Sequence, residues 1–75
     1  MKEKILELLQ REYPEIDFTQ SDTLVEDGML DSLTLTGIIA LLTMEFEIMI
    51  PYEDIVEENF NSVTAMTKLV QKLQN

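Results

Sequence analysis

Apolar residues recur at helical spacing along most of this chain, and this pattern constrains the fold more than any other feature. Three segments show it clearly: residues 2–12, 32–46 and 62–73. The first must end before Pro14, which cannot continue a helix, and the last begins at Ser62, a good N-cap residue. Pro51 is well placed to start a short helix that continues through Glu58. The pattern predicts an all-α fold, a small bundle of three principal helices plus one short helix.

The segment between the first two helices, residues 13–31, is long for so small a domain. It nevertheless carries five apolar residues: Ile16, Phe18, Leu24, Val25 and Leu30. These side chains indicate a loop that packs down over the core, and such loops are more often functional than idle. The residues expected to face inward from the helices are Ile5, Leu8 and Leu9 in the first, Leu35, Ile38, Ile39, Leu42 and Phe46 in the second, and Val63, Met66, Leu69, Val70 and Leu73 in the third. Residues 48–51 are expected to form an extended link.

Length and charge limit the functions open to the chain. Its 75 residues make a single domain, residues 1–75, and a chain of this size hides only about 60% of its unfolded surface, which leaves no room for an enclosed active site. Fifteen acidic residues against five basic ones give a formal charge of −10. This charge disfavours nucleic acid and anionic membranes as partners, and it favours basic protein surfaces.

The residue types needed for catalysis are missing. Without cysteine or histidine, the chain has neither a thiolate nor a Ser-His pair, so we do not expect an enzyme. The acidic residues at 53, 54, 57 and 58 lack calcium-loop spacing, and we expect a solvated helix face there rather than a metal site. The N-terminus has no signal-peptide pattern, and the uncharged run of residues 32–44 is too short to span a bilayer. We therefore expect a cytoplasmic monomer.

A serine stands where an acidic, glycine-containing loop meets the second helix, in the tripeptide Asp31-Ser32-Leu33. At the start of a helix its hydroxyl is expected to face solvent, near backbone N–H groups that favour an attached phosphate. Asp31 is expected to be the N-cap of this helix. Because Ser32 has no catalytic partners, these features indicate a residue that another protein modifies.

The outward face of the second helix is uncharged. Leu33, Thr36, Gly37, Ala40 and Met44 fall on one line opposite the inward stripe. Surface helices normally carry charged residues there, so we interpret this line as a docking face, with the small Gly37 allowing a partner to approach closely. Burial all round, or self-association through the same line, is the alternative.

These elements together resemble the acyl and peptidyl carrier proteins. The run from Glu26 to Leu33 resembles the phosphopantetheine attachment motif of that family, whose core is Asp-Ser-Leu. Residues 45–51 are similar to the usual end of the second helix in the family, and residues 59–63 look like the start of its last helix. Nearly the whole chain fits, including its length and long first loop.

The resemblance implies that Ser32 receives 4′-phosphopantetheine from coenzyme A through a phosphopantetheinyl transferase, with Asp31 helping to hold the magnesium of that enzyme. It further implies that acyl or aminoacyl groups travel as thioesters between an adenylating ligase and acyl-transferring or synthase enzymes. Carriers of fatty-acid synthesis are usually acidic along the second helix, at positions that here hold Thr34, Gly37, Thr43 and Met44.

This departure favours a specialised pathway, such as a carrier paired with an adenylating ligase, a D-alanyl carrier for cell-wall polymers or a carrier of secondary metabolism. The competing hypothesis is a small helical interaction domain without a prosthetic group.

Overall fold

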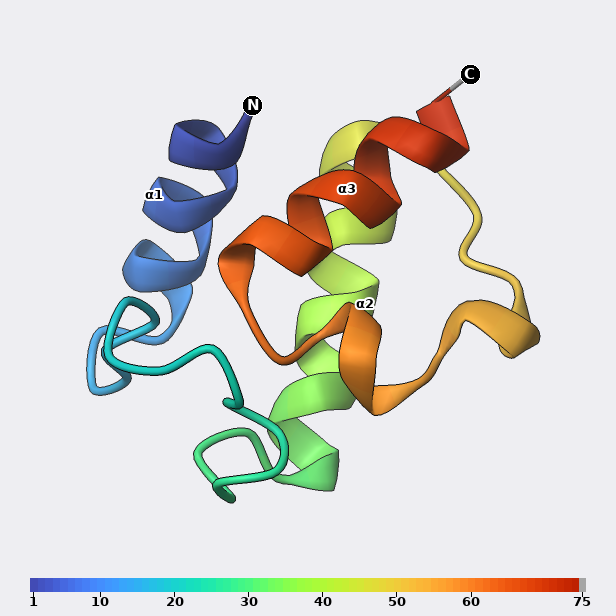
Figure 1. Cartoon of the computed structure of the whole chain (residues 1–75). Coiled ribbons are helices and arrows are strands. Elements are labelled where there is room, and N and C mark those ends of the chain that lie inside the picture. Colours follow the sequence, from blue (N-terminus) through green and yellow to red (C-terminus); the bar gives the residue numbers. More distant parts are fainter. Residues whose placement is uncertain (75) are drawn as a thin grey trace.

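The computed structural model describes residues 1–74, which form an all-helical bundle with no strand in that range. Its elements are α1 (Lys2–Glu12), α2 (Ser32–Phe46), the short 3-10 helices η1 (Tyr52–Asp54) and η2 (Glu57–Asn59), and α3 (Val63–Gln74). In Figure 1, α1 descends from the N-terminus, the long loop runs beneath it, and α2 ascends through the middle behind α3. The first turn of α2 therefore lies at the opposite end of the bundle from Met1 and the last turn of α3. The all-α prediction and its three principal helices are confirmed.

Local capping explains where the helices begin and end. Asp31 is the N-cap of α2, with extended backbone, and its carboxylate accepts a hydrogen bond from the Thr34 N–H at 2.8 Å. The Ser62 hydroxyl caps α3 in the same way, accepting from the Ala65 N–H at 3.0 Å. At the far end of α2, Glu47 adopts a left-handed conformation with φ of 52°. These caps satisfy N–H and C=O groups that a helix end leaves without a partner.

The short fourth helix differs from its prediction. The segment from Pro51 to Glu58 contains two single turns of 3-10 helix instead of one continuous helix. Between them, Ile55 and Val56 leave the helical conformation, and Val56 is fully extended (φ −130°, ψ 154°). Their branched side chains favour an extended backbone. The Asn59 side-chain amide also donates to the Asp54 carbonyl at 2.8 Å, which stabilises the break.

The core lies between the three α-helices and is closed by the long loop. Phe18, Leu24 and Leu30 of that loop are at most 3% exposed, which confirms that the loop packs over the core. The predicted inward faces also form, with Leu35, Ile39, Phe46 and Leu73 half-buried and the others buried. Each fully buried apolar side chain stabilises the fold by about 1.5–3 kcal/mol relative to exposure. The loop before Ser32 is thus a packed part of the structure.

Within residues 1–74, no helix has the length and apolarity needed to cross a bilayer.

Candidate functional site

Ser32 is the first residue of α2, and its side chain is exposed at the end of the bundle. Asp31 provides the N-cap of this helix, so the serine hydroxyl is not needed for capping. The other two serines of the chain differ: Ser21 bonds to Thr23 and Asp27, and Ser62 caps α3. Of the three, only Ser32 has a hydroxyl without a hydrogen bond to any described residue. Its oxygen is therefore free to react with an incoming group.

Asp31 is held in its ionised form. Its carboxylate accepts from the Thr34 backbone N–H, which lowers the pKa of Asp31 below its usual 3.8, and the Thr34 side chain adds to this effect. At neutral pH a fixed negative charge therefore stands next to Ser32. One carboxylate beside a substrate phosphate is a common way to hold Mg²⁺, so the position suits the role that the resemblance implies for Asp31.

The loop that leads to Ser32 is folded back on itself. The Leu24 carbonyl accepts from the N–H groups of Met29 and Leu30, at 3.0 and 3.1 Å. Gly28 makes this turn possible with a φ of 80°, which side-chain-bearing residues rarely adopt. Leu30 is then buried directly before Asp31 and Ser32. The buried leucine and the cap together fix where the serine is presented.

The outward line on α2 is mostly open to solvent. Leu33 and Met44 are 84% and 79% exposed, and Thr36 and Ala40 are also exposed. Large exposed apolar side chains on a helix face without charge make this line a candidate docking surface. The Thr36 hydroxyl bonds to the Ser32 carbonyl at 2.8 Å, so this part of the line is tied to the first turn of the helix.

Gly37, on the same line, packs against another part of the chain. It is half-buried, and a Cβ added there would collide with the hydroxyl of Tyr13, which follows α1. The space beside this glycine is therefore occupied by the chain's own tyrosine. Packing between α2 and Tyr13 therefore explains the lack of a side chain at Gly37, and its part in docking stays a prediction.

Sequence reasoning missed two residues that support the site, Tyr13 and Asn61. Tyr13 packs beside Gly37. The Asn61 side chain accepts hydrogen bonds from Val25 and Glu26 of the long loop, which precede it by 36 and 35 positions. No local pattern marks either contact, because both partners are distant in the sequence. Two exposed apolar side chains after α2, Met49 and Tyr52, were also missed; they are 83% and 89% exposed.

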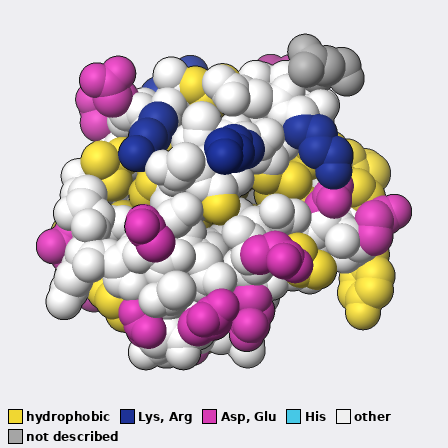
Figure 2. All heavy atoms as spheres, viewed as in Figure 1, with side chains coloured by type: hydrophobic (Ala, Val, Ile, Leu, Met, Phe, Trp, Pro, Cys, Tyr) yellow, Lys and Arg dark blue, Asp and Glu magenta, His cyan; other side chains and the backbone are white. Residues whose placement is uncertain are grey.

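Charges are separated along the molecule. Every Lys and Arg lies in residues 1–11 or 68–75, whereas residues 12–67 contain all the acidic residues except Glu3 and Glu7. In Figure 2 the basic side chains gather on the upper part of the face, and most acidic ones lie below, toward the end where α2 begins. The Ser32 end is thus strongly negative and suits a basic partner.

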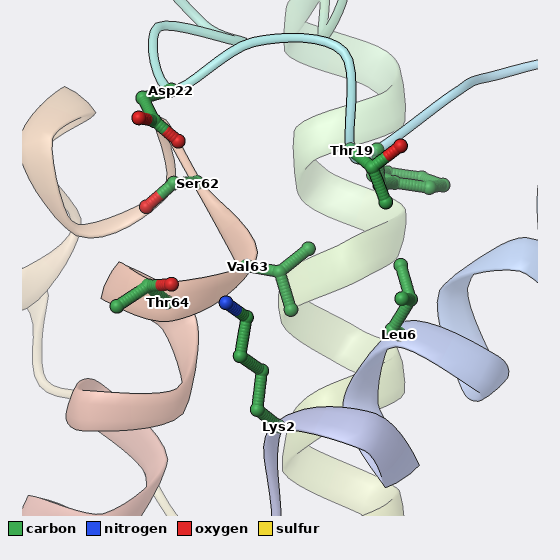
Figure 3. Close-up of a pocket in the computed structure, with 8 residues that line it drawn as sticks. Lys2, Leu6, Thr19, Asp22, Ser62, Val63 and Thr64 are labelled. Atoms are coloured by element: carbon green, nitrogen blue, oxygen red, sulfur yellow. The ribbon is translucent and has the colours of Figure 1, made fainter.

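A pocket of about 130 Å³ lies elsewhere, between α1, the long loop and the start of α3. Figure 3 shows Leu6 and Val63 at its floor, and Lys2 extending from α1 toward the first turn of α3. None of the predicted site residues lines it. Ser32 is exposed and lies outside this pocket.

An exposed serine at a capped helix start, presented by a packed loop in a small helical bundle, is the arrangement of a covalently modified carrier domain. Residues 1–70 match the family model described as "Phosphopantetheine attachment site", and the chain belongs to this family of phosphopantetheine-binding carrier proteins. It is 32% identical to the D-alanyl carrier protein of Streptococcus uberis (strain ATCC BAA-854 / 0140J), over 100% of this chain and 96% of the relative. The D-alanyl carrier protein of Streptococcus pyogenes serotype M5 is 29% identical over the same shares. No solved structure matches the chain significantly.

Family membership confirms the prediction of a carrier over that of an interaction domain without a prosthetic group. The chain is an acyl or aminoacyl carrier, and its cofactor is covalently attached 4′-phosphopantetheine. When attached, this group supplies the thiol that the polypeptide lacks, on which an acyl or aminoacyl group is carried as a thioester. Proteins of this family serve partner enzymes such as synthetases and transferases, and are not themselves the catalysts.

Proposed function

We propose that this chain is an aminoacyl carrier of the D-alanyl type, with its phosphopantetheine attached to Ser32. The main support for Ser32 as the attachment site is the difference in hydrogen bonding between the three serines. Two hydroxyls are engaged in hydrogen bonds, whereas that of Ser32 is exposed and free because Asp31 caps the helix in its place. The full-length similarity to two D-alanyl carrier proteins supports the D-alanyl cargo.

The first turn of α2 suits a phosphodiester. Helix N-termini carry a partial positive charge and backbone N–H groups without intrahelical partners, and both favour a phosphate. In this account Ser32 provides the bonding oxygen. Because Asp31 caps the helix, the Ser32 oxygen is not needed as a cap, and the Asp31 carboxylate can bind the magnesium of the transferase.

Enzymes that act on the carrier are proposed to dock on the exposed line of α2. The accessible part of this line consists of Leu33, Thr36, Ala40 and Met44. Gly37 lies on the same line, and Tyr13 packs beside it. No charge interrupts this line, so contact depends on apolar fit, while the surrounding carboxylates steer basic partners toward it. A phosphopantetheinyl transferase, an adenylating ligase and an acyl-transferring enzyme would each use this surface in turn. Because coenzyme A and ATP are intracellular substrates, loading would take place in the cytoplasm.

The attachment site is tested by intact-mass measurement after incubation with coenzyme A and a phosphopantetheinyl transferase. We expect one added phosphopantetheine on the wild-type chain and none on Ser32→Ala. Ser62→Ala is the matched control, because it removes another serine from a helix start and should still be modified. Modification of Ser32→Ala, or of no variant at all, would refute Ser32 as the anchor.

The cargo is tested with the modified protein, ATP and a ligase specific for D-alanine. We expect D-alanine to be attached in a form released by hydroxylamine, and L-alanine to be attached far more slowly. Efficient attachment of a different acyl group by its own ligase, with none of D-alanine, would replace the D-alanyl assignment and leave the carrier function intact.

A further inference from the structure

Asn61, just before the N-cap of α3, is a buried polar residue whose side-chain oxygen and nitrogen both form hydrogen bonds. It is 8% exposed. Its side-chain oxygen accepts from the backbone N–H groups of Val25 and Glu26, at 2.9 and 3.2 Å, and its amide nitrogen donates to the Glu26 carboxylate at 3.2 Å. Its own carbonyl accepts from the Leu24 N–H at 2.8 Å. One residue therefore binds three consecutive N–H groups of the long loop.

These contacts lead directly to Ser32. The peptide of Leu24 donates to Asn61 through its N–H group, while the Leu24 carbonyl accepts from Met29 and Leu30. Leu30 is 3% exposed and immediately precedes Asp31, the cap of α2. A continuous series of hydrogen bonds thus runs from the residue before the N-cap of α3, through Leu24, to Leu30, two residues before Ser32.

We propose that Asn61 is a positioning residue for the modification of Ser32: it holds residues 24–30 in the one arrangement that presents the serine to the transferase. The proposal rests on the proposed attachment at Ser32 and adds a residue that lies outside the attachment motif. Asn61 does not reach Ser32 itself, and its effect is transmitted through Leu24 and Leu30.

The consequence of losing the side chain follows from its bonds. Asn61→Ala leaves the Val25 and Glu26 N–H groups without an acceptor inside a packed loop, which favours loop arrangements that expose them to water. Only a fraction of the molecules then has the loop arrangement that the transferase binds, and the apparent affinity for the transferase is multiplied by that fraction. Once bound to the transferase the loop is reordered, so KM rises while kcat changes little. We expect KM to rise about tenfold, equivalent to about 1.4 kcal/mol.

Val70→Ala is the matched control for general destabilisation. Val70 is fully buried in α3, so its truncation destabilises the core without removing a hydrogen bond of the loop. At a temperature where both variants are folded, we expect Val70→Ala to keep the wild-type KM. Amide hydrogen exchange provides an independent measurement: Val25 and Glu26 should lose protection in Asn61→Ala and keep it in Val70→Ala.

A polarity swap tests the hydrogen bonds themselves. Asn61→Asp keeps an acceptor for the two N–H groups but places a carboxylate against Glu26, so KM should rise. Adding Glu26→Gln restores a donor opposite that carboxylate, and the double variant should return to within about threefold of the wild-type KM. Glu26→Gln alone still accepts from Asn61, and its KM measures the effect of the lost charge, so that the double variant is compared with it as well as with wild type.

The outcomes separate this proposal from the one it rests on. If wild-type protein is not modified at Ser32, the attachment site fails and Asn61 has nothing to position. If wild-type protein is modified and Asn61→Ala has the same KM as Val70→Ala, the positioning role alone is refuted. A double variant no better than Asn61→Asp would refute it equally, because the hydrogen bond to Glu26 would then not matter.

Discussion

The contact between Gly37 and Tyr13 gives a sharp test of how α2 is packed. Glycine inside a helix costs about 1 kcal/mol relative to alanine, so Gly37→Ala would normally stabilise the protein. Here the new methyl group would collide with the Tyr13 hydroxyl, and overpacking costs about 1–3 kcal/mol. In the wild-type background the two effects oppose each other, and we expect Gly37→Ala to be neutral or destabilising.

Removing the tyrosine hydroxyl should reverse the result. In Tyr13→Phe the nearest remaining ring carbon lies 3.5 Å from the position of the new methyl group, an ordinary van der Waals contact. Gly37→Ala should then stabilise by about 1 kcal/mol, the full gain in helix propensity. The coupling between the two substitutions is therefore expected to equal the overpacking cost, about 1–3 kcal/mol.

Urea unfolding followed by far-ultraviolet circular dichroism measures all four proteins of this cycle. A small domain has an m-value near 1 kcal/mol/M, so the coupling should separate the midpoints by about 1 M or more. Equal effects of Gly37→Ala in both backgrounds, within about 0.5 kcal/mol, would refute the packing explanation. The folded double variant also tests Gly37 as a docking position: if it is loaded by the ligase with the wild-type KM, the glycine serves packing alone.

Three further perturbations test the capping of α2 and its outward face. The pKa of Asp31 is lower in the folded state, so the stabilising effect of its carboxylate is complete above pH 3.8 and is lost as the pH falls through the folded pKa. In urea titrations, the stability difference between wild type and Asp31→Asn should therefore shrink below pH 3.8. A difference that stays constant with pH would contradict the cap. Glu47→Gly should raise the free energy of unfolding by about 1 kcal/mol, because it removes a side chain from a left-handed position, and a loss of stability would show that the Glu47 side chain matters more. Leu33→Asp should raise the KM for ligase loading about 10- to 100-fold, because about 1.5–3 kcal/mol of apolar burial is lost. The control Thr64→Asp adds the same charge on α3 and should leave this KM unchanged. Equal effects of the two substitutions would show that charge alone is responsible.

Local patterns were sufficient to predict the main helices and the exposed position of Ser32 at the start of α2. Pro14 marked the end of α1, and the bounds of α2 from Ser32 to Phe46 agree with the structure. Apolar spacing also identified the buried faces, because burial and helical periodicity are directly linked. Ser32 could be singled out because helix-start residues and an attachment motif coincide there.

Features that depend on distant contacts could not be predicted. Gly37 looked like an open position because nothing in α2 indicates that Tyr13, which is 24 positions earlier, fills the space beside it. Asn61 looked like an ordinary residue before a helix, although its partners are in the long loop. The break at Ile55 and Val56 depends on an amide from Asn59 reaching back to Asp54. Each of these outcomes is decided by tertiary geometry and not by local propensity.

The separation of charge along the bundle gives the molecule an electric dipole. In the field of a positively charged enzyme, such a dipole experiences a torque that turns its negative pole forward before any atoms touch. The end that bears Ser32 therefore faces the enzyme when the two proteins meet, and a larger share of collisions has the productive orientation. Raising the ionic strength shortens the range of that torque to a few ångströms, so association should slow even though the contacts made afterwards stay the same.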